Sequence, residues 1–231
     1  MLLTNTMKEL GNTVNNLRKL LNKEFLKRVL SVFIFVPIVI IPIIYSNYLL
    51  IIVYILFNSI ILYELNNLKS KDINILFINS SMVVATLSFI LFILIIITNP
   101  IDKIKIIEII ITIWLFDTFS YVGGNLIGGK KLIPKISSGK TISGLLTGMI
   151  TTLIILQSYN YYYIGFEYIN LIITVGVIIL SFLGDIFASI IKRMASVKDS
   201  SNLLPGHGGF YDRFDSFIGV FFVFGLIILF S

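Results

Sequence analysis

Polar side chains gather between two long apolar stretches near the C-terminal end of this chain, in residues 189–215. These 27 residues contain three aspartates, four lysines or arginines, the only histidine and three glycines. Charged side chains at or within a bilayer are costly and are retained mainly where they are paired or functional. Carboxylates are ligands that Mg²⁺ prefers, and lysine and arginine form strong hydrogen bonds with phosphates. The cluster therefore indicates a site for metal ions and phosphate groups.

The composition of the whole chain identifies the environment of this site. Its 231 residues are 57% hydrophobic and 13% charged, with a mean hydropathy of +0.97, whereas soluble domains carry roughly 25% charged residues. There is no cysteine, so disulfides are excluded. A spanning helix needs about 20 predominantly apolar residues. We therefore predict an all-α, polytopic membrane protein with about seven spanning helices, at residues 28–46, 48–64, 75–97, 106–124, 142–158, 168–191 and 216–230.

We expect two regions along the chain. Residues 1–27 place apolar side chains in alternating steps of four and three, with lysines and arginines beside this stripe. The pattern predicts a cytoplasmic amphipathic helix at the membrane surface, with a short coiled coil as the alternative. No short apolar core precedes a small-residue cleavage site there, so we expect no cleavable signal. Residues 28–231 have no repeat or linker, and we expect one membrane-embedded domain with cytoplasmic catalytic loops.

The distribution of basic residues predicts the orientation. If the N-terminus is cytoplasmic, 16 of the 18 lysines and arginines fall in cytoplasmic segments, and only Lys103 and Lys105 lie outside them. This asymmetry follows the positive-inside rule. Topology therefore explains the formal charge of +6, and no nucleic-acid partner is required. The same orientation places Asp117 and Asp185 near the cytoplasmic ends of their helices, beside the polar loops.

A second polar segment runs from Asp117 to Thr141. Its Gly-Lys-Thr sequence at 139–141 suggests a P-loop, but that motif needs a glycine five residues before the Gly-Lys pair, after a strand. Pro134 occupies that position, and we expect no strand before it. The P-loop interpretation is therefore rejected.

The residue types in 189–215 form one continuous string: Ser189-x-x-Lys192-Arg193, then Lys198-Asp199, then Pro205-Gly206-His207-Gly208-Gly209-x-x-Asp212-Arg213-x-Asp215. This string resembles the signature of the phosphatidate cytidylyltransferases, also called CDP-diacylglycerol synthases. The 117–141 segment resembles a second conserved region of the same family. Three positions depart from it: Ser138 replaces the usual proline, Ser143 the usual glutamate, and Ala188 a glutamate or similar residue.

The resemblance implies an enzyme of the cell (inner) membrane that transfers CMP from CTP to phosphatidate in phospholipid biosynthesis, giving CDP-diacylglycerol and pyrophosphate. It also implies Mg²⁺, a second cation that is expected to be K⁺, and a homodimer. Two highly anionic reactants must meet in this reaction. Divalent cations and Lys or Arg donors that neutralise their charge suit that chemistry.

The resemblance assigns ten residues of this sequence to three overlapping roles. The catalytic group comprises Asp117, Lys140, Asp185, Asp212 and Asp215. The substrate-binding group comprises Lys192, Arg193, Lys198, His207 and Arg213. The metal ligands are Asp185, Asp212 and Asp215.

Each assignment has an alternative. Asp185 could form a buried ion pair with Lys192 or Arg193. Asp212 and Asp215 could merely stabilise the start of the last helix through its dipole. Asp117 could serve helix packing, the basic residues could be topology anchors, and His207 could make a loop hydrogen bond. For the whole protein, the alternatives are a CTP-dependent transferase with another lipid acceptor, or a transporter or ion channel. A transporter is disfavoured because the acids cluster at one end of the helices and no repeat is visible.

Overall fold

The structure is a computed structural model that describes residues 36–68, 75–98, 103–163, 165, 167–204 and 208–230. Six of its helices are long and apolar enough to cross a membrane. They are α3 (Asn47–Leu68), α4 (Ile75–Thr98), α5 (Lys103–Ile127), α6 (Ile142–Tyr163), α7 (Tyr168–Met194) and α8 (Tyr211–Phe230). The prediction of an all-α, polytopic membrane protein is confirmed. Of the first predicted span, 28–46, the described part is the helix Val36–Tyr45, and the predicted amphipathic helix in 1–27 lies outside the described residues.

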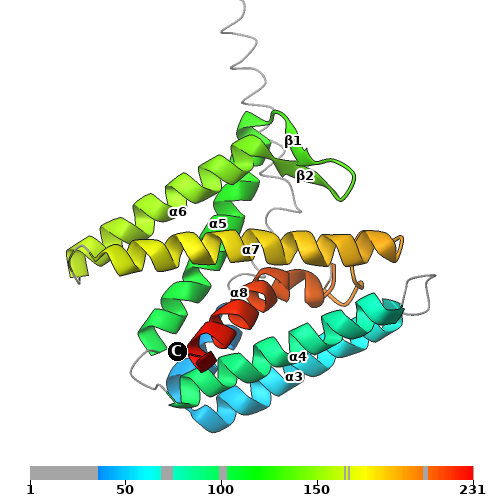
Figure 1. Cartoon of the computed structure of the whole chain (residues 1–231), viewed down its shortest axis with the longest axis horizontal. Helices are drawn as coiled ribbons and strands as arrows, with labels where there is room; N and C mark the ends of the chain where they lie inside the picture. The colour runs from blue at the N-terminus through cyan, green and yellow to red at the C-terminus, as the bar shows by residue number, and fades with distance from the viewer. Residues whose placement is uncertain are drawn as a thin grey trace, which may run out of the picture.

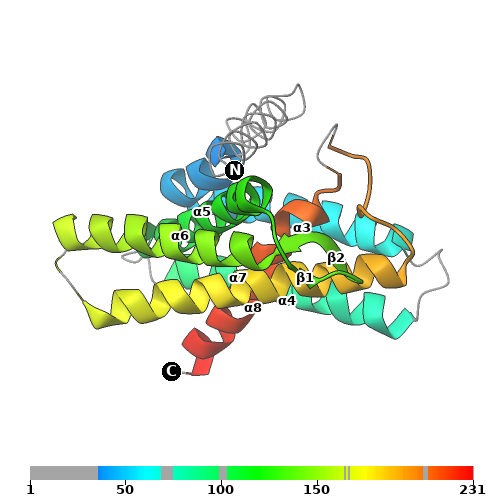
Figure 2. The same ribbon diagram turned by 90° about the horizontal axis from the view of Figure 1, so that it is seen from above.

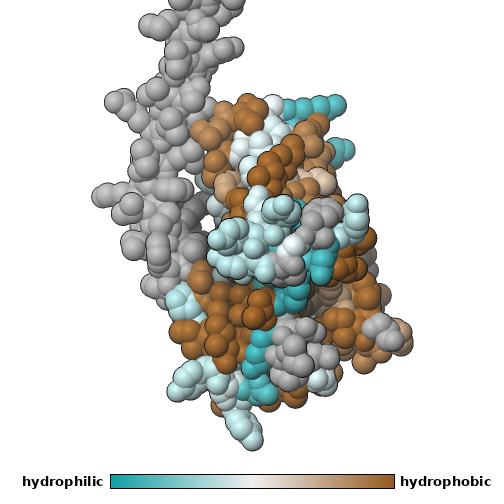
Figure 3. All heavy atoms as spheres, turned by 90° about the vertical axis from the view of Figure 1, so that its left-hand side faces the viewer, coloured by the Kyte–Doolittle hydropathy of each residue, from teal (hydrophilic) through white to brown (hydrophobic). Residues whose placement is uncertain are grey.

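The chain forms helices because lipid offers no hydrogen-bond partners to the backbone, so each spanning segment must satisfy its own N–H and C=O groups. Large hydrophobic side chains remain exposed on every spanning helix, for example Ile52 on α3 and Leu183 on α7. Brown, hydrophobic side chains cover much of the face in Figure 3, with a paler polar band across it. Such a surface suits contact with lipid rather than with water.

The helices are arranged as two groups joined by α8. Helices α3 and α4 form an antiparallel pair, and α6 runs antiparallel to α7 (Figures 1 and 2). Helix α5 crosses α7 and packs mainly against α6. Helix α8 lies between these groups and contacts both α7 and α4 extensively. The last helix in the sequence is therefore central in the molecule.

Aromatic side chains hold α8 against α3 and α4. Eight rings form a continuous cluster with centroid separations of 4.5–6.1 Å. They belong to Tyr54, Phe57, Phe89, Phe92, Phe210, Phe214, Phe217 and Phe221. Tilted and edge-on contacts at these distances are the favourable arrangements for aromatic pairs. The Ser88 hydroxyl adds a hydrogen bond from α4 to the Ile218 carbonyl, at 3.0 Å.

Glycines allow the other face of α8 to approach α7 very closely. A Cβ added to Gly219 would lie 2.7 Å from the Cα of Gly184 and 2.9 Å from the Leu180 carbonyl oxygen. Backbones can approach this closely only where side chains are absent, as small residues permit in membrane helix pairs. This contact brings the first turns of α8, which carry Asp212 and Asp215, next to Asp185 on α7.

Between α5 and α6 the chain forms an antiparallel hairpin of β1 (Lys131–Ile133) and β2 (Ser137–Thr141). The expectation that no strand precedes Pro134 is therefore wrong. The strands are only three and five residues long, too short for an alternating pattern to be recognised in the sequence. Pro134 starts the turn between them, and Gly139 and Lys140 lie inside β2 rather than in a phosphate-binding loop. The P-loop interpretation remains rejected.

We expect Gly219→Ala to lower the free energy of unfolding by about 1–3 kcal/mol, because its methyl group must push α7 and α8 apart. Gly176→Ala on α7 is the matched control, since no atom lies within 4 Å of its added Cβ. That variant should be as stable as the wild type or slightly more stable, given the higher helix propensity of alanine. Unfolding of the purified proteins in detergent micelles measures both effects. Equal stability of the two variants would contradict the close contact.

Candidate active site

A cavity of about 440 Å³ lies between α5, α6, α7, α8 and the hairpin, and it is lined by charged side chains. Nine of the ten predicted site residues line it; the tenth, His207, lies outside the described residues. The charged lining comprises Asp117, Lys140, Asp185, Lys192, Arg193, Lys198, Asp199, Asp212, Arg213 and Asp215. Two segments that are far apart in the sequence thus contribute to one site.

Helix α7 supplies one wall. Asp185, Ser189 and Lys192 lie on one face at steps of four and three, as helical geometry requires, and the Ser189 hydroxyl lies 3.3 Å from Asp185 Oδ1. The cationic partner of Asp185 is Lys140 of β2, whose Nζ lies 2.7 Å from Asp185 Oδ2. The ion pair proposed from the sequence, with Lys192 or Arg193, is therefore not the one formed.

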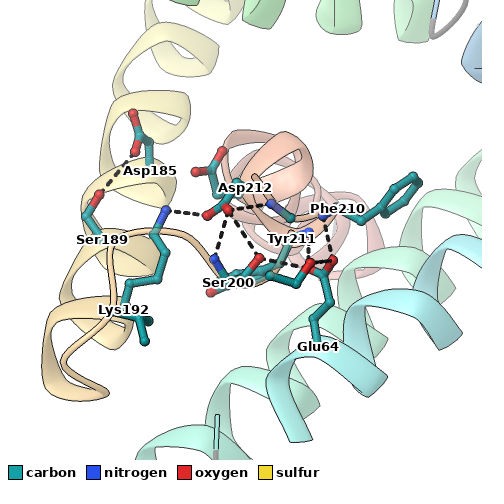
Figure 4. Close-up of polar contacts among 12 residues, drawn as sticks. Glu64, Asp185, Ser189, Lys192, Ser200, Phe210, Tyr211 and Asp212 are labelled. Atoms are coloured by element: carbon teal, nitrogen blue, oxygen red, sulfur yellow. Dashed lines mark hydrogen bonds and ion pairs between the residues drawn. The ribbon is translucent and has the colours of Figure 1, made fainter. Parts of the chain in front are cut away.

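Lys192 instead pairs with Asp212 at the start of α8. Its Nζ lies 2.5 Å from Asp212 Oδ1, and both side chains are at most 10% exposed. Asp212 Oδ2 accepts hydrogen bonds from the backbone N–H groups of Ser200 and Gly209, both at 2.9 Å, and lies 3.2 Å from the Ser200 hydroxyl (Figure 4). Both oxygens of Asp212 are therefore engaged within the protein.

Asp117, Asp185 and Asp215 lie within electrostatic range of one another, on three different helices. Their mutual repulsion is offset by Lys140, Lys192 and Arg213. Among the described residues, Asp215 accepts a hydrogen bond from the backbone of its neighbour Ser216, at 2.8 Å. Each oxygen of Asp185 has one contact, but its side chain is 33% exposed, against 7% for Asp212. Asp215 and Asp185 therefore keep more capacity for a ligand in the cavity than Asp212 does.

This donor set suits Mg²⁺ in a particular way. The acids offer only oxygen atoms, the ligands that Mg²⁺ prefers, and a divalent ion would relieve the repulsion among three carboxylates. The described residues contain no group of three or more Asp, Glu, His or Cys side chains arranged to hold an ion alone. Mg²⁺ is commonly bound by one or two carboxylates together with substrate phosphates and waters. Asp185 and Asp215, with Asp117 nearby, fit that arrangement.

Arg193 and Lys198 are exposed at the rim. Arg193 donates from Nε to the Ile136 carbonyl at 2.9 Å and from Nη1 to the Val197 carbonyl at 2.7 Å. It therefore links the hairpin to the end of α7 and to the following loop. This contact holds Lys140, which the hairpin carries, over the cavity.

Of the three positions that depart from the family pattern, Ser143 has a clear structural role. Ser143 donates to the Gly128 carbonyl and lies 3.0 Å from the Thr141 hydroxyl, which in turn accepts from the Gly144 N–H at the start of α6. Ala188 is buried on α7, and Ser138 is exposed in β2. Ser143 therefore secures the junction between the hairpin and α6.

Sequence reasoning missed Glu64, a fully buried carboxylate on α3 that bonds to the loop before α8. A signal was present, because Glu64 is the only charged residue in the predicted span 48–64. Ionisable residues in spanning segments mark functional positions. Several uncharged polar residues of the cavity wall were also missed: Ser120, Tyr121, Asn125, Ser137 and Thr141.

Comparison with known proteins agrees with this geometry. The profile of the cytidylyltransferase family matches residues 70–231, which is more than half of the chain and contains every residue named in the cavity. The chain belongs to the cytidylyltransferase family.

Several relatives within this family share much of the sequence. The phosphatidate cytidylyltransferase of Rickettsia bellii is 35% identical over 214 residues, which cover 87% of this chain and 91% of that protein. The protein of the same name from Rickettsia conorii is 34% identical over 200 residues, or 83% and 85% of the two chains. That from Bacillus subtilis is 42% identical over 125 residues, which cover 52% of this chain and 46% of the relative.

We expect Lys192→Met to lower the free energy of unfolding by about 3 kcal/mol, since it leaves the buried Asp212 carboxylate without its cation. Lys198→Gln removes a cation from an exposed position of the same cavity. It should change stability by no more than about 0.5 kcal/mol. Denaturant titrations in micelles compare the two. If Lys192→Met unfolds like Lys198→Gln, the buried ion pair does not stabilise the site.

Proposed function

We propose that this protein is a phosphatidate cytidylyltransferase that transfers CMP from CTP to phosphatidate, giving CDP-diacylglycerol and pyrophosphate. The observation that carries the proposal is the cavity between α5, α7 and α8, where aspartates from three helices lie together with lysines and arginines. It lies in the part of the chain that matches the family profile, and relatives that align over most of their length bear this name.

In this reaction a phosphate oxygen of phosphatidate forms a bond to the α-phosphorus of CTP, and the bond from that phosphorus to the bridging oxygen of pyrophosphate breaks. Charge accumulates on the transferred group and on the leaving group. Lys140, Lys192 and Arg213 line the cavity on three different elements, so they can contact several phosphates of the two substrates at once. Fixed cations in a site of low dielectric stabilise such charge because they need not reorganise.

The two ion pairs of the cavity suggest how the substrate-free site is kept stable. Lys140 neutralises Asp185, and Lys192 neutralises Asp212. When anionic phosphates enter with their counterions, each lysine can turn towards a phosphate while its aspartate gains another positive partner. Arg193 and Lys198 at the rim attract the anionic substrates.

The residues proposed to hold Mg²⁺ are Asp185 and Asp215, with Asp117 close by and Asp212 able to join only if it gives up Lys192. When bound, the ion would draw negative charge from the triphosphate and help pyrophosphate to leave. A second ion, expected to be K⁺, remains a prediction from the resemblance, as does a homodimer.

We also propose the cell (inner) membrane of a bacterium as the location, with the N-terminus and the cavity on the cytoplasmic side. The relatives named above are bacterial proteins. The exposed lysines of the hairpin, Lys130, Lys131 and Lys135, lie beside the cavity and favour this orientation. CTP is a cytoplasmic metabolite, so the cavity would face its supply.

The deciding experiment is turnover by purified, detergent-solubilised protein supplied with labelled CTP, phosphatidate and Mg²⁺. Formation of lipid-linked CMP together with an equal amount of pyrophosphate would support the proposal. Folded protein that gives neither product, even with added K⁺, would overturn phosphatidate as acceptor. The same assay with other lipid phosphates would then identify the acceptor class.

Asp215→Asn should lower kcat by at least about 100-fold, because it removes the charge with which Asp215 would bind the cation and offset the site's lysines. Membrane insertion and the elution profile in detergent should be unchanged. Glu108→Gln is the matched control: Glu108 is a bonded acid on α5, nine residues before Asp117, that does not line the cavity and contacts Asn160 and Lys105. It should turn over like the wild type. Wild-type turnover by Asp215→Asn would contradict the role given to Asp215.

Removal of divalent cations with a chelator should abolish formation of lipid-linked CMP, and Mg²⁺ in excess should restore it. The reason is that no three described acids can hold the ion without substrate phosphates, so the ion should exchange readily. The control is an equal concentration of chelator already saturated with Mg²⁺. Full activity after extensive chelation would contradict metal dependence.

A further inference from the structure

Glu64 of α3 accepts four hydrogen bonds from the segment that leads into α8. Its side chain is fully buried. Oε1 accepts from the Phe210 N–H at 2.7 Å and from the Ser201 hydroxyl at 2.6 Å. Oε2 accepts from the Tyr211 N–H and from the Ser200 hydroxyl, both at 2.8 Å. Figure 4 shows the carboxylate reaching from α3 towards Ser200, Phe210 and Tyr211.

A carboxylate buried in this way is costly unless strong partners replace water. Among the described residues Glu64 forms no ion pair, so hydrogen bonds must compensate its charge. Two of its four donors are backbone N–H groups at the start of α8, where the helix dipole also favours negative charge. The carboxylate therefore stabilises the start of α8 and is stabilised by it.

Gly209 makes room for this arrangement. A Cβ at that position would lie 1.8 Å from the Ser200 hydroxyl and 2.6 Å from Glu64 Oε2. A glycine also has no side chain with which to cap the helix that follows. Glu64 supplies the missing acceptor from another helix, in the manner of an N-cap side chain.

The contacts of Glu64 continue directly to the cavity. Ser200 donates its hydroxyl to Glu64 and its backbone N–H to Asp212, and Asp212 holds Lys192 of α7. A continuous set of hydrogen bonds thus joins α3 to α7 through the loop and the first turn of α8. Asp215 follows Asp212 by one helical turn, so the direction of that turn determines where both carboxylates point.

We propose that Glu64 is a positioning residue for cytidylyl transfer: it holds the loop 198–204 and the start of α8 so that Asp212 and Asp215 face the cavity. This inference rests on the proposed function. Glu64 precedes residue 70, where the match to the family profile begins. The site therefore depends on a helix outside the matched region, and Glu64 is not among the residues that line the cavity.

The test compares Glu64→Gln with Leu65→Ala. The glutamine keeps the size of the side chain but turns one acceptor oxygen into an N–H₂ group, which must face a backbone or hydroxyl donor. Leu65 is the next residue, fully buried in the apolar core, and its truncation destabilises α3 without changing the carboxylate. Thermal unfolding in micelles establishes how much stability each variant loses.

We expect Glu64→Gln to lower kcat about 10- to 100-fold, as small displacements of catalytic groups do, with little change in KM for CTP. Leu65→Ala should lose stability but keep wild-type kcat. In hydrogen exchange, peptides spanning 198–213 should exchange faster in Glu64→Gln than in Leu65→Ala. This second readout needs no turnover, so it tests the inference even if the wild type proves inactive with phosphatidate, an outcome that would count against the proposed function alone.

Wild-type kcat with unchanged exchange in Glu64→Gln would overturn the inference, and so would equal kinetic losses in the two variants. If Glu64→Gln does not insert, Ser201→Ala takes its place, because it removes a single hydrogen bond to Oε1. That variant should lower kcat several-fold and speed exchange in the same peptides. Wild-type values in both measurements would reject a positioning role.

Discussion

The ion pair between Asp212 and Lys192 fixes the point at which the chain re-enters the helix bundle, and the site depends on it. Lys192 lies at the end of α7 and Asp212 at the start of α8, so the pair closes the loop between them at both ends. The second oxygen of Asp212 gathers the N–H groups of Ser200 and Gly209. A buried pair of this kind contributes less through its attraction than through the cost of leaving either charge alone. It therefore strongly disfavours other paths for the loop.

The apolar part of the molecule supports this polar end. On one side, α8 packs its aromatic rings against α3 and α4, and on the other its glycine backbone meets α7. Together these contacts determine the position of α8 along its axis and its rotation about that axis. Because packed interiors resist small displacements, the carboxylates at the start of α8 are held by the whole length of the helix as well as by their own hydrogen bonds.

The site is also divided among elements in a way that suits two anionic substrates. Cations come from the hairpin, α7 and α8, and acids come from α5, α7 and α8. Helices α7 and α8 contribute charges of both signs, while α5 contributes an acid and the hairpin a lysine. Opposite charges therefore lie close together, which limits the repulsion among like charges in the cavity. The hairpin, which Arg193 anchors to α7, brings Lys140 to Asp185. Ser143 secures the other end of this hairpin in place of the glutamate common in the family.

The sequence by itself determined the class of protein, the approximate positions of six spanning helices and nearly all charged residues of the cavity. Hydropathy and helical periodicity are local properties, and the spacing of polar types in 189–215 is readable without a structure. The partners of those residues could not be read in this way. Asp185 pairs with Lys140 rather than with a neighbour on its own helix, and Glu64 reaches the start of α8 from α3. Such pairs join segments that are distant in the chain, and only the packing of α3, α7, α8 and the hairpin brings their side chains within bonding distance.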